Sequence, residues 1–339
     1  MLLAMLIAPW PLLTLALCAC ACMHSVAAFD YPPSSNSDMS IEEQMTYLSN
    51  AVYGDCDLVE GWHRVHSLSL TSTWFREHDK FAIFNKNDEC VIAFSGTDSP
   101  FDIVDNFDGR TVNMCGFEGV HRGFASEVND LLAAPEWKKT FRPYLSGRDC
   151  RGGVTVVGHS LGGAQASIFA ACANNGRRPY SFTVKALYTH GGPAPSKTQL
   201  PNHEAADGCF AGARFYSQDR WDYDPIPALA RMLFFEHPKV PAVRLSRPAM
   251  FHRNYIEYYT FGCNTTCAAS YPNPSRRHVP SPTMHLMAKS YIPRVIDVYS
   301  ACKAVEKAGT CGAKTSRVHS LTKHMRSVSS RLKRWQWWR

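Results

Sequence analysis

Short apolar runs alternate with longer stretches of helical periodicity along this 339-residue chain. The runs are rich in β-branched or aromatic residues and are bounded by polar turns, which is typical of buried strands. They lie at residues 81–84, 90–94, 154–157, 184–188 and 214–216. The periodic stretches predict helices that begin at Ile41 behind an N-cap Ser40, near residue 122, at Leu161 and near Lys289. Strands that alternate with helices in this way predict an α/β architecture with a partly parallel sheet.

Two hairpins are expected at the margins of that sheet. The runs at 81–84 and 90–94 flank a polar turn at 85–88, which predicts a hairpin that feeds the sheet. Residues 243–245 together with 255–261 predict a second, added hairpin.

The strand at 154–157 leads into the most informative segment of the chain, Gly158-His159-Ser160-Leu161-Gly162. It fits G-x-S-x-G, the nucleophile elbow, a sharp strand-to-helix turn that exposes a serine. Such a turn needs residues without bulk two positions before and after the serine, and both are glycine here. We interpret Ser160 as a nucleophile and the N–H of Leu161 as an oxyanion donor. An ordinary glycine-rich turn is the alternative interpretation.

A serine nucleophile needs a base that takes its proton and a carboxylate that orients the base. The chain supplies both behind the serine, in the order Ser, Asp, His that α/β-hydrolases use. The candidate acid is Asp224, on a proline-rich loop, and Asp219 and Asp222 are close rivals. The candidate base is His285. By position alone, three further histidines have a comparable claim: His237, His252 and His278.

Five segments of the chain occur in the order found in class 3 lipases, the fungal triacylglycerol lipase type. They are AFSGTDS at 93–99, VHRGF at 120–124, GHSLGGA at 158–164, DPIP at 224–227 and HLMAKSYI at 285–292. The chain resembles this family over nearly all of residues 81–292. The resemblance implies an α/β-hydrolase fold, with a mostly parallel central sheet flanked by helices and a short lid at about residues 99–113. It also implies a triad of Ser160, Asp224 and His285, with Thr97 as the second oxyanion donor.

The activity implied by the resemblance is hydrolysis of carboxylic esters of lipids through an acyl-enzyme, without a cofactor or metal. The chain departs from the family at two places. Ser95 stands where the family usually has arginine, and the lid segment carries aspartates in place of the tryptophan common in the fungal enzymes. The substrate therefore stays open between triacylglycerols, phospholipids and feruloyl-type esters. A catalytically inactive, lipase-like binding protein is the alternative of a different class.

The N-terminal residues and the cysteines predict export. Residues 2–22 are almost wholly apolar and are followed by small residues, so we interpret 1–28 as a signal peptide, with a membrane anchor as the alternative. Removal of 1–28 would leave ten of the 13 cysteines, enough for five disulfides, with local pairs expected at 263/267 and 302/311. Asn264 lies in a glycosylation sequon. We therefore expect a secreted or extracellular glycoprotein whose hydrolase domain spans 29–312.

The basic charge of the chain is concentrated in its last segment, residues 313–339. This segment holds eight Lys or Arg and no acid, which leaves 28 bases against 29 acids elsewhere. Its apolar residues follow steps of three and four and form one helical stripe: Val318, Leu321, Met325, Val328, Leu332 and Trp335. We expect an amphipathic tail that binds an anionic membrane or lipid surface. A disordered tail and a coiled-coil partner are the alternatives, and export makes a nucleic-acid partner unexpected.

Overall fold

A computed structural model describes residues 39–54, 59, 61–71, 78–97, 109–176, 180–218, 222–229, 234–245, 279–292 and 294–296 of the chain. The predicted signal peptide, the basic tail, the sequon at Asn264 and the predicted strand at 255–261 lie outside these residues. Within them, no helix is long and apolar enough to cross a membrane.

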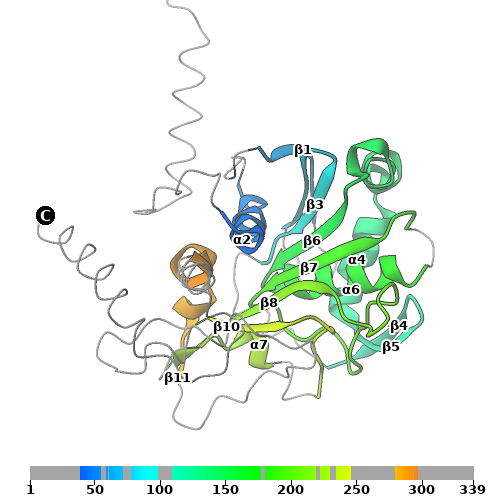
Figure 1. Ribbon diagram of the computed structural model, residues 1–339. Helices are drawn as coiled ribbons and strands as arrows, with labels where there is room; N and C mark the ends of the chain where they lie inside the picture. The colour runs from blue at the N-terminus through cyan, green and yellow to red at the C-terminus, as the bar shows by residue number, and fades with distance from the viewer. Residues whose placement is uncertain are drawn as a thin grey trace, which may run out of the picture.

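A seven-stranded sheet runs through the middle of the molecule (Figure 1). Its order is β1 (His63–Thr71), β2 (His78–Lys86), β3 (Glu89–Phe94), β6 (Gly153–His159), β7 (Val184–His190), β8 (Ala211–Ser217) and β10 (Ala242–Leu245). The first three strands pair antiparallel, and every later pair, from β3–β6 to β8–β10, is parallel. The expected mostly parallel sheet is therefore confirmed.

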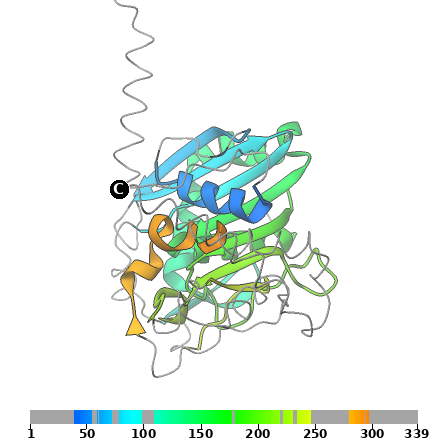
Figure 2. The same ribbon diagram turned by 60° about the vertical axis from the view of Figure 1, so that its left-hand side comes forward.

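Helices cover both faces of this sheet (Figures 1 and 2). One face packs against α4 (Arg122–Ala133) and α6 (Leu161–Asn174), and the other packs against α2 (Ile41–Ala51) and η6 (Met287–Tyr291). Each face of the sheet has its own hydrophobic core, the first under α4 and α6 and the second under α2 and η6. Alternate residues of a strand pack into these two cores, because successive side chains point to opposite faces. Phe81 and Ile83 lie in the first core, and Ala82 and Phe84 lie in the second.

The remaining elements are short. They are β4 (Thr111–Met114), β5 (Phe117–His121), η2 (Trp137–Phe141), α5 (Arg142–Leu145), η3 (Arg148–Cys150), β9 (Asp222–Tyr223), α7 (Ile226–Leu229), β11 (Val279–Pro280) and η5 (Pro282–His285).

The first predicted helix is confirmed together with its cap. Ser40 accepts a hydrogen bond from the backbone N–H of Glu43 at 3.2 Å, and the Glu43 carboxylate accepts one from the Ser40 N–H at 2.6 Å. This reciprocal arrangement is a capping box, which satisfies two backbone donors at the helix start.

The described strands differ from the sequence-based expectations at three places. Residues 243–245 belong to β10, a strand parallel to β8, and the expected partner arm at 255–261 lies outside the described residues. The last part of the predicted lid forms β4, which pairs with β5 in a separate two-stranded sheet, while residues 99–108 lie outside the described residues. The strand β1 was not predicted, although Val65, Leu68 and Leu70 give it an apolar side.

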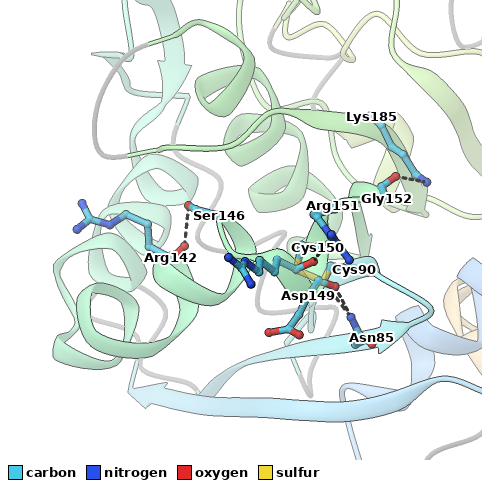
Figure 3. Close-up of a disulfide and its surroundings, with 10 residues drawn as sticks. Asn85, Cys90, Arg142, Ser146, Asp149, Cys150, Arg151, Gly152 and Lys185 are labelled. Carbon is cyan, nitrogen blue, oxygen red and sulfur yellow. Dashed lines mark hydrogen bonds between the residues drawn. A yellow bond between two sulfur atoms is a disulfide. The ribbon is translucent and has the colours of Figure 1, made fainter.

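Two disulfides have both cysteines among the described residues, which confirms that cysteines of this chain are paired. Cys90 of β3 bonds to Cys150 of η3, as Figure 3 shows, and Cys115, in the turn between β4 and β5, bonds to Cys172 of α6. Asn85 adds a side-chain hydrogen bond to the Asp149 carbonyl at 2.6 Å beside the first disulfide. The expected local pairs at 263/267 and 302/311 lie outside the described residues.

Candidate active site

Ser160 lies at the sharp turn between β6 and α6. Its backbone has φ 56° and ψ −129°, a left-handed conformation that is strained for a residue with a side chain. The turn is held by a hydrogen bond from the Ser160 N–H to the His190 carbonyl at 2.9 Å and by one from the Gly163 N–H to the Ser160 carbonyl at 2.9 Å. The geometry is that of a nucleophile elbow.

The two glycines of the motif allow the strand and the helix to approach each other. A Cβ at Gly158 would overlap the carbonyl oxygen of Gly162, and a Cβ at Gly162 would overlap the carbonyl oxygens of Ser95 and Phe94. Each position therefore needs glycine because a backbone carbonyl occupies the space of a side chain.

The Ser160 hydroxyl is within hydrogen-bond distance of His285. The distance from Ser160 Oγ to His285 Nε2 is 2.7 Å, and Nδ1 of the same ring lies 3.0 and 2.9 Å from the two carboxylate oxygens of Asp224. The exposed fractions of Ser160, His285 and Asp224 are 1%, 2% and 0%. The structure thus brings together three residues from segments far apart in the sequence, and it buries the whole arrangement.

Strand pairing places Asp224 and His285 side by side. The Asp224 N–H donates to the carbonyl of Ser217, the last residue of β8, at 2.8 Å. The neighbouring strand β9 pairs with β11, which directly precedes the turn that ends at His285. The loops that carry Asp224 and His285 are therefore joined by a short parallel ladder.

The Asp224 carboxylate receives further hydrogen bonds. The Ile226 N–H donates to its Oδ1 at 2.9 Å, and the phenol of Tyr291 donates to its Oδ2. A buried carboxylate needs such donors, because an ion without partners is costly inside a protein.

The rival candidates are placed elsewhere or lie outside the described residues. Asp222 is exposed on β9, and the His237 ring lies 3.2 Å from the Pro227 carbonyl. Asp219, His252 and His278 are outside the described residues.

The strand that precedes Thr97 passes beside the serine. In the parallel ladder of β3 and β6, Phe94 faces Gly158, so the same register brings Gly96 alongside Ser160. A Cβ at Gly96 would lie only 2.6 Å from the Ser160 Cβ. Gly96 is therefore the residue of this segment that comes closest to Ser160, and Thr97 follows it directly. Leu161, the first residue of α6, follows Ser160 in the chain.

Two further histidines line the buried surroundings and are neutral. Burial lowers the pKa of His190 to about 3, and its Nε2 lies 2.9 Å from the Thr46 hydroxyl. Burial, followed by the proximity of His285, lowers the pKa of His159 well below the ordinary value. Neither ring therefore adds a positive charge next to His285 near neutral pH.

Sequence reasoning missed the side chains around the three central residues. Tyr291 lies inside the segment HLMAKSYI, but its contact with Asp224 spans 67 residues. Tyr53 and His159 also adjoin the site, and in the sequence only the position of His159 next to Ser160 indicates this. No group of three or more potential metal ligands occurs among the residues that the structure covers.

The mostly parallel sheet, its flanking helices and the elbow define an α/β-hydrolase fold, as expected. Residues 91–208 match the model of the class 3 lipase family, so the resemblance to these lipases is confirmed over that segment. The matched segment includes Thr97 and Ser160 and ends before Asp224 and His285.

Several solved lipase structures are similar to this chain, while no curated protein matches it. Lipase II from Rhizopus niveus is 18% identical, over 60% of this chain and 79% of its own, with a TM-score of 0.46. Rhizomucor miehei triacylglyceride lipase is 20% identical, over 60% and 78%, with a TM-score of 0.46. Lip2 lipase from Yarrowia lipolytica is 14% identical, over 61% and 78%, with a TM-score of 0.45.

Proposed function

We propose that this protein is a secreted serine hydrolase that cleaves carboxylic ester bonds of lipids. Ser160 is the nucleophile, His285 is the general base and acid, and Asp224 orients the imidazole. One observation carries the proposal: the continuous hydrogen-bonded line from Ser160 Oγ through His285 to Asp224 inside a buried site.

The chemistry follows from the position of each proton. His285 Nε2 removes the hydroxyl proton as Ser160 Oγ attacks the ester carbonyl carbon, and Asp224 stabilises the imidazolium that forms. The N–H groups of Leu161 and Thr97 hold the oxyanion of the tetrahedral intermediate. The intermediate collapses when Nε2 returns the proton to the leaving alcohol oxygen. Water then attacks the acyl-enzyme in the same way and releases the carboxylic acid and free Ser160.

Lipid esters are the favoured substrate class because the matched family model is that of lipases. The two disulfides agree with an oxidising compartment and hence with secretion. Ser95 and the aspartates of the 99–113 segment distinguish this chain from the fungal pattern, so phospholipids and feruloyl-type esters are the alternatives within the same chemistry.

A substrate panel tests the proposal. The purified full chain is assayed with p-nitrophenyl esters from acetate to palmitate, with emulsified triacylglycerol and with phospholipid. The matched control is Ser160→Ala, which removes only the nucleophilic oxygen and should abolish turnover and fluorophosphonate labelling while the melting temperature is retained. If the native protein cleaves no ester and is not labelled by fluorophosphonate, the enzymatic proposal fails and the lipase-like binding protein takes its place.

A further inference from the structure

Tyr53 connects the end of the first helix to the candidate active site. It lies two residues beyond the last residue of α2, a helix that packs against β3, β6 and β7. The phenol oxygen accepts a hydrogen bond from the Gly96 N–H at 2.6 Å and lies 2.7 Å from Nδ1 of His159. Lys80 holds the same residue from the other side, since its Nζ donates to the Tyr53 carbonyl at 3.0 Å. The hydroxyl is therefore fixed between the strand end that precedes Thr97 and the residue that precedes Ser160.

The partners of His159 determine where its proton lies. Nε2 is 2.8 Å from the carbonyl oxygen of His285, and a carbonyl can only accept a hydrogen bond. Nε2 therefore carries the hydrogen. In a neutral imidazole the other nitrogen, Nδ1, is then an acceptor, so the Tyr53 hydroxyl donates to it.

These assignments give one unbroken line of donors and acceptors. The Gly96 N–H donates to the Tyr53 oxygen, the Tyr53 hydroxyl donates to His159, and His159 donates to the backbone of His285. Hydrogen bonds in such a chain polarise one another, and each group has a definite direction. The line joins the three segments that carry Thr97, Ser160 and His285.

Packing around the line agrees with a role in holding the site together. The His159 ring lies against the His285 ring, with centroids 4.9 Å apart, and makes an edge-type contact with the Tyr291 ring at a centroid distance of 5.9 Å. A Cβ at Gly96 would lie 2.6 Å from the Ser160 Cβ and 2.8 Å from the Tyr53 hydroxyl oxygen. The Tyr53 hydroxyl and Ser160 thus both lie against the Gly96 backbone, and the hydrogen bond to Tyr53 fixes that backbone next to the serine.

We propose that Tyr53 and His159 are positioning residues of the hydrolase, which align the Gly96–Thr97 backbone and His285 with Ser160 through this line of hydrogen bonds. The inference rests on the proposed function, because alignment matters only if Ser160 attacks a carbonyl. Neither residue takes a proton from the substrate. The helix α2, which contributes none of the three central residues, thereby becomes part of the catalytic apparatus.

The charged and titratable groups around His159 are consistent with a neutral, orienting ring. Tyr53 faces it from the end of α2, His285 from η5, His190 from β7 and Tyr291 from η6. A protonated His159 would repel the imidazolium that forms on His285 during the reaction, and the pKa of His159 is held low by burial.

The proposal is tested by breaking the line at different points. Tyr53→Phe removes the acceptor of Gly96 and the donor to His159 while the ring is kept. His159→Gln keeps an amide donor for the His285 carbonyl but removes the acceptor of Tyr53. The acylation rate of each full-length variant is measured by stopped flow with p-nitrophenyl butyrate, well below its melting temperature. We expect each variant to acylate about tenfold more slowly, which corresponds to the loss of one hydrogen bond of about 1.4 kcal/mol. The ester concentration that gives half-saturation should change less than about twofold.

A double variant separates alignment from independent damage. If both residues act through the same line, the double variant Tyr53→Phe with His159→Gln should acylate no more slowly than the slower of the two single variants. Losses that multiply would overturn the proposal, and so would near-native acylation by Tyr53→Phe. If Tyr53→Phe does not fold, the comparison of His159→Gln with His159→Asn decides. The Asn amide can accept from Tyr53 but does not reach the His285 carbonyl, so both variants should be slow, and near-native acylation by either one would overturn the proposal.

Tyr180→Phe is the matched control. The Tyr180 hydroxyl is buried in the core beside Trp137 and has no hydrogen-bond partner among the described residues. Its removal should leave the acylation rate unchanged. Failure of the proposed function is distinguishable from failure of this inference. If the native protein neither cleaves esters nor reacts with fluorophosphonate, both the proposed function and the positioning role are ruled out. If the native protein and the Tyr53→Phe variant are both fully active, only the positioning role is ruled out.

Discussion

Tyr291 donates a hydrogen bond to Oδ2 of Asp224, the same carboxylate oxygen that lies 2.9 Å from Nδ1 of His285. The phenol and the imidazole therefore share one acceptor inside a site from which water is largely excluded. Since the Ile226 N–H donates to the other oxygen, the carboxylate has a donor on both sides, which restrains its rotation relative to the His285 ring.

Removal of the Tyr291 hydroxyl should weaken both the fold and the reaction. In Tyr291→Phe a buried, charged acceptor loses one donor, which typically costs about 1–3 kcal/mol of unfolding free energy. We expect turnover to fall several-fold, because the Asp224 carboxylate loses one of its restraints. Urea unfolding and ester turnover measure the two effects, and Tyr180→Phe, whose hydroxyl has no partner in the described structure, is the control. Equal stability of the two variants would show that the Tyr291 contact contributes little.

The identity of the acid is tested by two asparagine variants on the same loop. Asp224→Asn should reduce turnover by about 10⁴-fold, because an amide no longer holds the imidazole in the productive tautomer. Asp222→Asn changes an exposed carboxylate of β9 and should leave turnover within about twofold. The reverse ranking, measured with one soluble ester, would assign the acid to Asp222.

The buried His190 should make the protein less stable in acid. Its pKa is lowered to about 3 by burial, whereas a histidine in the unfolded chain has a pKa of about 6.5. Below about pH 6.5 the unfolded state takes up a proton that the folded state does not, so the contribution of this residue to stability is full above that pH and is lost as the pH falls toward 3. His190→Gln should therefore show a shallower fall of unfolding free energy between pH 6.5 and 4 than the native protein. Parallel curves would contradict this prediction.

Both disulfides should contribute strongly to stability. They close loops with sequence separations of 60 and 57 residues, and in the chain-entropy model each such loop is worth roughly 4 kcal/mol. We expect Cys115→Ala with Cys172→Ala to lower the urea midpoint, and we expect reductant to lower the melting temperature of the native protein. Thiol titration in denaturant without reductant is the check. A count that includes all four of these cysteines would refute the pairing.

Local patterns in the sequence predicted the parts of this molecule that depend on neighbouring residues. The N-cap at Ser40 and the G-x-S-x-G turn are short-range features, and the structure has both where they were expected. The residues Asp224 and His285 were selected mainly through the resemblance to class 3 lipases, since position alone left several rivals. Their proximity to Ser160 is a long-range fact that the structure supplies.

The missed side-chain contacts share one physical cause. Tyr53 and His159 are 106 residues apart, and no local signal indicates that a phenol at the end of one helix meets the residue before the nucleophile. The hairpin of β4 and β5 is different, because its strands are separated only by a short turn and the pairing is local. Side-chain pairs that depend on how strands and helices stack cannot be deduced from one sequence.

The basic tail carries the last prediction, which concerns residues outside those that the structure describes. On a helix from about residue 317 to residue 335, an apolar stripe would oppose basic faces, and Trp335, Trp337 and Trp338 end the chain with side chains that favour the lipid boundary. Each Lys or Arg near an anionic surface adds about 1 kcal/mol of binding. A chain that ends at Gly312 should therefore keep its turnover of soluble short-chain esters but lose binding to vesicles that contain anionic lipid.

Vesicle sedimentation of the full-length and shortened proteins tests this expectation at low and high salt. Binding of the full-length protein should weaken as salt rises, because the surface potential is screened within a Debye length. A variant in which Lys323, Arg326 and Arg331 are replaced by glutamine keeps the length and the apolar stripe, so it separates charge from hydrophobic insertion. Equal vesicle binding by the full-length and shortened chains at every salt concentration would rule out a membrane-binding tail.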